Sequence, residues 1–306
     1  MCAATNQALN ALQAIESDFY EILFTLEDRD TPVCSFDQSL LVNAELFLLS
    51  PEYQAEHMSM LPSILTRLIS TIEDPQVDFI KVVTDLCDAP DVAREILTIA
   101  NSDMYNAKGK DIRTIQHATS LIGLVSVGYI ATTVLMSHVT RTKSSFFKSF
   151  SDIIHKHTIQ TAMAGRDLAH QHGVNAFCSH VLGLIHNCGV VYSFNCLSNK
   201  LGESTKVKQP NPVLYQKVCR QWGDIMTVEI ARKWAMPQIM VEALEQLRAP
   251  QAGLGKMLFL ADLLSKTSLL VEHQKMTREA GIEVMTSHQL PRDYVENFFD
   301  MAKELE

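Results

Sequence analysis

The stretch Val181-Leu-Gly-Leu-Ile-His-Asn-Cys-Gly-Val190 sets two adjacent polar residues, His186 and Asn187, inside an otherwise apolar run. Such a run is typical of a helix buried in a protein core. Buried polar side chains need partners, because a polar group that moves from water into the core costs free energy unless it forms a new hydrogen bond there. We therefore expect neighbouring helices to bring partners to this doublet, and we take it as the centre of the fold.

The composition indicates a compact and mostly helical protein. The chain has 306 residues, 47% of them hydrophobic, with only 12 glycines and 10 prolines. This excludes a disordered or fibrous chain. The formal net charge of −9 gives no broad attraction to nucleic acid or to anionic lipid. We expect a signalling protein or a small molecule as partner, with no nucleic acid and no membrane, and the oligomeric state stays open.

Cysteine usage and the N-terminus indicate the compartment. The seven cysteines form no Cys-x-x-Cys pair, which is typical of thiols in a reducing cytosol. The N-terminal residues lack the basic start and the apolar run of a signal peptide. We predict a cytoplasmic protein.

One apolar segment resembles a membrane span. No Asp, Glu, Lys or Arg occurs from Ile115 to Thr140. A spanning helix needs ~20 mostly apolar residues, whereas polar residues such as Gln116, Ser126 and Thr132 interrupt this segment. We predict a central buried helix instead.

Apolar spacing and stop residues predict further helices along the chain. Ser50-Pro51 is interpreted as a helix stop, because a residue before proline disfavours helical geometry. The predicted helices cover residues 4–28, 37–49, a stretch from Pro62 to Ile72, 77–87, 88–102, 146–172, 179–194, a short helix after Pro237 and a closing helix from Pro291.

A series of motifs follows in a fixed order. They are Asp88-Ala-Pro90, Leu97-Thr-Ile-Ala-Asn101-Ser102, Ile112-Arg-Thr-Ile115, His157-Thr158, Gly183-Leu-Ile-His-Asn-Cys-Gly189, Trp234-Ala-Met-Pro237 and Ala261-Asp262. The series resembles the HDOD family, HD-related output domains of bacterial signalling, from about residue 58 to residue 265. Ala89 is an insertion relative to the Asp-Pro of that family.

The resemblance implies a degenerate metal site. In active HD hydrolases two His and two Asp hold a divalent metal that activates water for attack on a phosphoester. The resemblance places His157, His186, Asn187 and Asp262 at those four positions. Asn in place of Asp keeps an oxygen but removes a negative charge, which weakens the attraction for a hard cation.

Further ligands of two-metal relatives are also missing. Relatives with a complete site carry histidines where this chain has Gly223, Gln246 and Leu247. We expect no catalytic residue, no resident metal and no cofactor. A divalent metal held by His157, His186 and Asp262 is kept as an alternative.

Asn101, Ser102 and Tyr105 form a second group of candidate residues. A ligand or partner contact is one interpretation of them. The other is structural, because Asn and Ser near a helix end can bond to free backbone groups. We favour the structural interpretation for Asn101 and Ser102.

These observations predict an all-α protein with a multi-helical HD-like bundle and an N-terminal helical subdomain. The predicted parts are an N-terminal extension (1–57), an N-terminal half of the HDOD domain (58–141) and a degenerate HD-like half (142–306). The predicted function is a non-catalytic regulatory module of signal transduction, with a protein or small ligand bound in a groove between the halves. The alternative is a divergent metal-dependent phosphohydrolase acting on nucleotides or cyclic dinucleotides.

Overall fold

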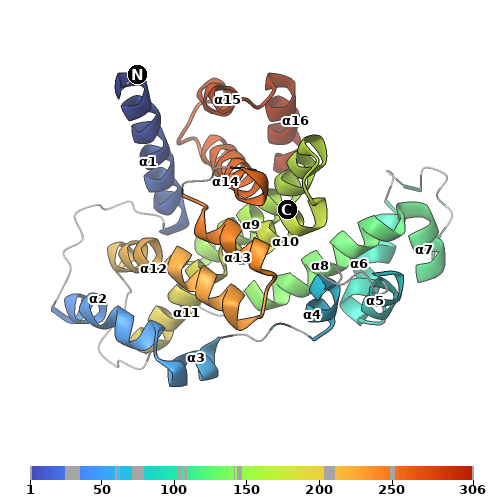
Figure 1. Cartoon of the computed structure of the whole chain (residues 1–306), viewed down its shortest axis with the longest axis horizontal. Coiled ribbons are helices and arrows are strands. Elements are labelled where there is room, and N and C mark those ends of the chain that lie inside the picture. Colours follow the sequence, from blue (N-terminus) through green and yellow to red (C-terminus); the bar gives the residue numbers. More distant parts are fainter. Residues whose placement is uncertain are drawn as a thin grey trace. The chain divides into compact units, whose positions relative to one another are not determined.

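The structure is a computed structural model that describes residues 2–24, 35–58, 61, 63–70, 79–102, 105, 106, 109, 111–140, 142, 147–202, 211–248 and 252–304. The regular elements in this part of the chain are the helices α1 to α16, and no strand occurs in it (Figure 1). The prediction of an all-α fold is confirmed.

The chain divides into two compact units. Unit 1 comprises residues 1–58, 141–230 and 242–306, and unit 2 comprises residues 59–140 and 231–241. This division differs from the boundaries predicted from the sequence, because the N-terminal 58 residues belong to the same unit as the second half of the chain.

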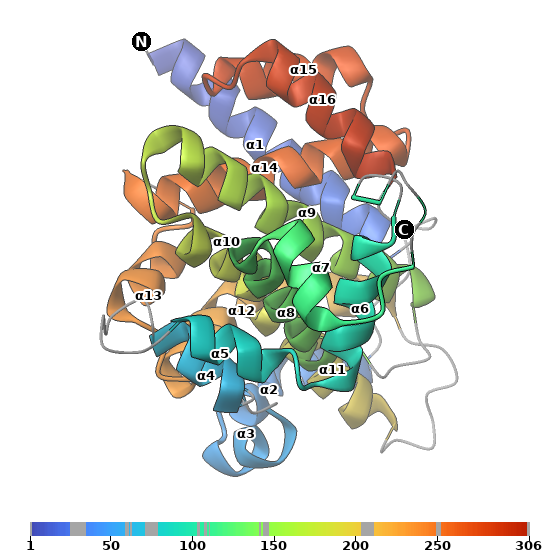
Figure 2. The ribbon, with the colours of Figure 1, turned by 90° about the vertical axis from the view of Figure 1, so that its right-hand side faces the viewer.

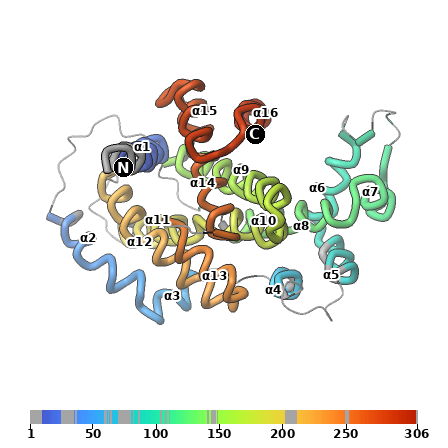
Figure 3. The backbone as a smooth tube through the Cα atoms, turned by 45° about the horizontal axis from the view of Figure 1, so that its top comes forward, coloured from blue at the N-terminus to red at the C-terminus, as the bar shows by residue number. Residues whose placement is uncertain are grey.

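Unit 1 is built around the long helix α9 (Lys148–His172). Its most extensive contacts are with α10 (Ala176–Ile185) and α14 (Gly253–Glu272), and α1 (Cys2–Phe24) also lies against α9 and α14 (Figure 2). The other helices with residues in unit 1 are α2 (Ser35–Leu48), α3 (Pro51–His57), α11 (Cys188–Gly202), α12 (Pro212–Lys233), α13 (Gln238–Glu245), α15 (Arg278–Ser287) and α16 (Arg292–Lys303). Helices α11 and α12 run side by side (Figure 3).

An aromatic cluster fixes α1 to the centre of unit 1. Phe24 of α1 stacks on Phe150 of α9 with ring centroids 5.2 Å apart, and Phe150 stacks on Phe194 of α11 at 4.0 Å. All three side chains are fully buried. Burial of each ring stabilises the fold by roughly 1.5–3 kcal/mol, so α1 is an integral part of this core.

Unit 2 contains α4 (Ser63–Ser70), α5 (Phe79–Leu86), α6 (Pro90–Ala100), α7 (Ile115–Ile122) and α8 (Leu124–Thr140). Helix α6 packs on α7 and α8. It buries Val92, Ile96 and Ala100, which recur every four residues and therefore share one helix face.

The single helix predicted for Ile115–Thr140 is wrong. The chain bends by 112° between α7 and α8, and Gly123 at the bend has a φ of 90°. Glycine adopts this angle readily because it lacks a Cβ atom. Among the described residues, Ala176–Leu201 also has the length and composition of a membrane span, but 89% of its apolar window is buried inside the protein, as in a core helix.

Other predicted elements differ mainly at their ends. Ser50-Pro51 ends α2, but it also begins the unpredicted α3, because the Ser50 side chain accepts a bond from the Tyr53 amide. The helix predicted over 88–102 is α6, which begins at Pro90 after Ala89 at the N-cap position and ends at Ala100. Residues 25–28, 62, 71–72, 77–78 and 146 of the predicted helices lie outside the described residues.

Candidate functional site

The central doublet lies between two helices rather than inside one, which corrects the predicted helix 179–194. His186 is the C-cap of α10, and α11 begins at Cys188. Backbone bonding continues on both sides, from the His186 amide to the Leu182 carbonyl and from the Val191 amide to the Asn187 carbonyl. The junction therefore keeps both side chains at a fixed place in the core.

The two glycines of the motif allow close helix approach on either side of the doublet. A Cβ atom on Gly183 would lie 2.4 Å from the Cα of Ala162 in α9, and one on Gly189 would lie 2.0 Å from the Gly223 carbonyl in α12. Only glycine fits at such distances. The close contact of α10 with α9 brings His186 next to His157.

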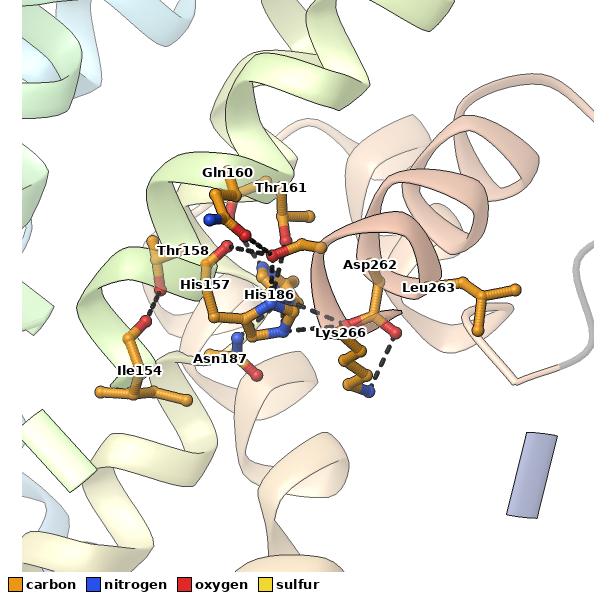
Figure 4. A network of polar contacts seen from close by, with 12 residues as sticks. Ile154, His157, Thr158, Gln160, Thr161, His186, Asn187, Asp262, Leu263 and Lys266 are labelled. Carbon is orange, nitrogen blue, oxygen red and sulfur yellow. Dashed lines mark hydrogen bonds and ion pairs between the residues drawn. The ribbon is translucent and has the colours of Figure 1, made fainter. Parts of the chain in front are cut away.

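Three side chains converge in unit 1, from α9, from the α10–α11 junction and from α14 (Figure 4). The Nε2 atoms of His157 and His186 are 3.2 Å apart. The Asp262 Oδ1 atom lies 3.2 Å from Nε2 of His157 and 3.4 Å from Nε2 of His186. All three residues are buried. The structure thus brings together His157, His186 and Asp262, with Asn187 beside them.

The hydrogen bonds of His186 determine its tautomer. Its Nδ1 atom lies 2.7 Å from the Gly183 carbonyl oxygen, which can only accept, so Nδ1 carries the proton. In the neutral ring, Nε2 then presents a lone pair to the cluster. The Asn187 Nδ2 atom lies 2.7 Å from Nε2 and donates to it. The substituted residue thereby occupies the lone pair that a metal would need.

His157 has a partner on each nitrogen. Nδ1 lies 2.8 Å from the Ser265 hydroxyl, and Nε2 faces Asp262. Without a metal, Nε2–H donates to Asp262 and the Ser265 hydroxyl donates to Nδ1. In the other tautomer, Nδ1–H of His157 donates to the Ser265 hydroxyl. That hydroxyl in turn donates a hydrogen bond to the Gln160 side-chain oxygen at 2.9 Å. Burial lowers the pKa of His157 to about 4, so its ring is neutral near pH 7.

A lysine supplies a positive charge next to the cluster. The Lys266 ammonium donates to Asp262 Oδ2 at 2.9 Å and to Glu16 Oε2 at 2.7 Å. Burial alone would raise the pKa of Asp262, but Lys266 and a hydrogen bond from His157 hold it well below its usual range. Burial alone would lower the pKa of Lys266, whereas Asp262 and Glu16 raise it. Asp262 and Lys266 are therefore both charged at neutral pH.

Helix α1 covers this cluster from one side. The Phe19 ring lies 4.7 Å from the His157 ring, and Glu16 bonds to Lys266. Sequence reasoning missed these contributions. Lys266 had a local signal, since it follows Asp262 by four residues on one helix face. Glu16 and Phe19 had none, because they are distant from the motifs along the chain.

The cluster has the spacing of metal ligands but an incomplete set of charges. An ion with ligands about 2.1 Å away holds neighbouring ligand atoms about 3.0–3.4 Å apart, in octahedral or tetrahedral geometry. The three convergent atoms match this spacing. However, the set contains one carboxylate, which is already paired with Lys266, and the neutral Asn187. The residues present do not fit a hydrolytic metal centre.

The positions of a second metal are also without ligands. A Cβ atom on Gly223 would lie 2.6 Å from Cγ2 of Val190, so this side chain fills the space beside Gly223. Gln246 and Leu247 follow α13 and offer an amide and an alkyl group. The histidines that the resemblance leads one to expect in a two-metal arrangement are therefore absent at these three positions.

The other predicted site residues lie in unit 2. The Asn101 amide group donates to the Leu97 and Ile112 carbonyls, and its oxygen accepts from the Ile112 amide, each at 2.9 Å. The Ser102 hydroxyl donates to the Ile99 carbonyl at 2.7 Å. These are the backbone bonds that the structural interpretation predicts. A ligand contact of Asn101, Ser102 or Tyr105 stays a prediction.

Comparisons with known proteins agree with the fold. Residues 58–250 match the model of the HDOD domain family. No curated protein matches the sequence. An HDOD domain protein of unknown function from Geobacter sulfurreducens superposes with a TM-score of 0.57 at 14% identity, over 88% of this chain and 99% of that chain.

Two further crystal structures have a similar fold. A candidate metal-dependent phosphohydrolase from Shewanella amazonensis has a TM-score of 0.55 and 16% identity, over 87% of this chain and 100% of that chain. A candidate signal transduction protein from Marinobacter aquaeolei has a TM-score of 0.54 and 16% identity, over 90% of this chain and 68% of that chain. At these identities the likeness concerns the fold alone. The family match spans more than half of the chain, and the protein therefore belongs to the HDOD domain family.

Proposed function

We propose that this HDOD protein is a regulatory module of signal transduction that binds a ligand or a protein partner without hydrolysing phosphoesters. The observation that carries the proposal is the Lys266 ammonium, bonded to both Asp262 and Glu16. It supplies, from the chain itself, positive charge next to the carboxylate that would otherwise attract a metal ion.

Hydrolysis by this class of site needs a strongly bound dication. The ion must lower the pKa of a bound water and stabilise charge on the phosphoester. Here the charges of Asp262 and Lys266 sum to zero, and Asn187 adds none. The Asn187 amide also occupies the His186 lone pair. The cluster is therefore better suited to hold helices together than to generate a nucleophile.

The family and the relatives support a signalling role. One structural neighbour is described as a signal transduction protein, and the resemblance noted from sequence is to output domains. We propose a cytoplasmic location as well, because Cys87, Cys178, Cys188, Cys196 and Cys219 are buried free thiols, as expected in a reducing compartment. The groove between the halves, expected from sequence, stays a prediction.

One observation favours the alternative of a divergent metal-dependent phosphohydrolase. The three potential ligand atoms are 3.2–3.4 Å apart, and a relative of similar fold is described as a candidate enzyme of that kind. A competent enzyme would have to displace Asn187 from His186 and bind its ion beside Lys266.

A turnover assay separates the two functions. The unmodified protein and a folded His186→Gln variant are incubated with nucleotides, cyclic dinucleotides and aryl phosphoesters, each with Mn²⁺, Fe²⁺ or Mg²⁺. The regulatory proposal predicts equal, background rates for both proteins. Turnover that is abolished by His186→Gln, with the helical circular dichroism spectrum unchanged, would overturn it.

A further inference from the structure

A cavity of about 630 Å³ opens beside the histidine cluster, and those of its lining residues that the structure describes belong to unit 1. This volume lies within the range of pockets that bind small molecules, roughly 300–1,000 Å³. The walls come from α1, α9, α11, α12, α14, the α10–α11 junction and the segment after α13. Much of the lining is apolar, and includes Leu12, Ile15, Phe19, Val190, Phe259 and Leu263.

The charged groups on the wall form an alternating chain. Asp224 pairs with Arg248, Arg248 with Glu16 at 3.7 Å, Glu16 with Lys266 at 2.7 Å and Lys266 with Asp262 at 2.9 Å. Each carboxylate among the described lining residues therefore already has a cationic partner. A cationic ligand would have to break one of these pairs to gain an attraction of its own.

Arg220 differs from the other two lining cations. Within the described residues, no carboxylate lies at ion-pair distance from its guanidinium. Its partner there is the Tyr20 ring, whose centroid is 5.7 Å from the guanidinium carbon. Tyr20 itself is buried, and its hydroxyl donates to the Cys219 carbonyl at 3.5 Å. Arg220 is thus an exposed cation, next to a fixed aromatic ring, at a cavity with apolar walls.

We propose that the cavity binds a small amphiphilic anion, with its carboxylate or phosphate on Arg220 and its apolar body against α1 and α14. This inference rests on the proposed regulatory function, and it names the class of ligand that the module recognises. An anion gains the Arg220 charge without breaking an existing ion pair. Arginine is also well suited to this role, because its planar guanidinium can form two parallel bonds to a carboxylate or phosphate.

Isothermal titration calorimetry tests the charge and the apolar body separately. The probes are octanoate, octyl phosphate, octylamine, octanol and butanoate, titrated at one low ionic strength. We expect octanoate or octyl phosphate, or both, to bind with one site per chain. Octylamine, octanol and butanoate should bind at least tenfold more weakly. The relative affinities of octanoate and octyl phosphate identify the preferred anionic group.

Variants of α12 locate the site. Arg220→Gln should weaken the anionic probe about tenfold, and Arg220→Lys should retain part of the affinity. Lys217→Gln is the matched control, since it removes an exposed positive charge from the same helix and does not line the cavity. It should leave the affinity unchanged. Equal loss in Arg220→Gln and Lys217→Gln would overturn the assignment, as would equal binding of octylamine and octanoate.

A failure of the anion-binding inference can be distinguished from a failure of the regulatory proposal. If no anionic probe binds a protein that is folded and inactive toward phosphoesters, the ligand class is wrong and the regulatory function stands. If the protein hydrolyses phosphoesters and His186→Gln abolishes this, the regulatory function is wrong whatever the probes do.

Discussion

The pairing of Lys266 with Asp262 predicts how a metal site could be restored. We consider the variants Asn187→Asp, Lys266→Gln and the double variant. In the unmodified protein the charges of Asp262 and Lys266 sum to zero, whereas in the double variant Asp262 and the carboxylate introduced at position 187 would contribute two negative charges. The double variant should therefore bind Mn²⁺ or Zn²⁺ through its two histidines and two carboxylates.

Coulomb's law gives the scale of the change. A dication bound at Asp262 would lie roughly 5 Å from the Lys266 ammonium, and with an effective dielectric constant of ~20 their repulsion is about 7 kcal/mol. The added carboxylate contributes attraction of similar size. These values are upper limits, since salt and water screen groups that are not fully buried. Even a fifth of each contribution changes the dissociation constant by more than about tenfold.

Thermal unfolding with and without metal measures this effect, because a ligand that binds only the folded state stabilises it. Without metal, Lys266→Gln should lower the melting temperature, since it leaves the buried Asp262 without its cation and Glu16 with Arg248 alone. Mn²⁺ or Zn²⁺ should raise the melting temperature of the double variant strongly and of the unmodified protein very little.

A matched variant controls for the loss of any lysine in unit 1. Lys156→Gln, combined with Asn187→Asp, removes a lysine of α9 that pairs with Glu272 of α14 at 2.9 Å. It should not confer the same response to metal. The reasoning is refuted if the unmodified protein is stabilised by metal as much as the double variant, or if the Lys156 control responds equally.

Three further predictions concern stability. Gly183→Ala should lower the free energy of unfolding by at least about 2 kcal/mol, because the added Cβ atom would lie 2.4 Å from the backbone of Ala162. Urea denaturation measures this change, and an unchanged denaturation midpoint would contradict the prediction. Asn101→Ala should cost about 2 kcal/mol, since the Ile112 amide and carbonyl lose their side-chain partner; hydrogen exchange should show faster exchange of the Ile112 amide. His157 has a folded-state pKa of about 4, below the ordinary value of 6.5. Between these pH values the unfolded chain binds more protons than the folded protein. The free energy of unfolding should therefore fall by about 3 kcal/mol as the pH decreases from about 6.5 to 4. Denaturation at several pH values should show a weaker dependence for His157→Gln, and an identical dependence would contradict the assignment.

The helical fold could be predicted from the sequence because its signals are local. Apolar spacing indicated α1, α9 and α16, and the doublet indicated where the site is built, although it was predicted inside one helix and lies between α10 and α11. The same local signals were ambiguous at Ser50-Pro51, which both ends α2 and begins α3. They also missed the bend at Gly123, since the apolar pattern continues through it while the backbone does not.

The candidate site was predicted only in part, for a different reason. His157, His186, Asn187 and Asp262 belong to motifs, so their meeting could be expected. The charges that decide what the cluster can do come from Glu16 and Lys266, and the contact between these two joins α1 to α14. No periodicity or spacing connects residues 250 positions apart. The pairing of Lys266 with Asp262 has the local spacing of an i,i+4 pair, but only the folded chain shows that Glu16 joins it.

The metal content of the unmodified protein tests the central claim most directly. The protein is purified without chelator, incubated with Mn²⁺, Fe²⁺ and Zn²⁺, freed of unbound ions and analysed for each element. We expect far less than one metal ion per chain, because Lys266 and Asn187 occupy the groups that would bind it. One tightly bound ion per chain, lost in a folded His157→Gln variant, would contradict the account and favour a metal-dependent phosphohydrolase.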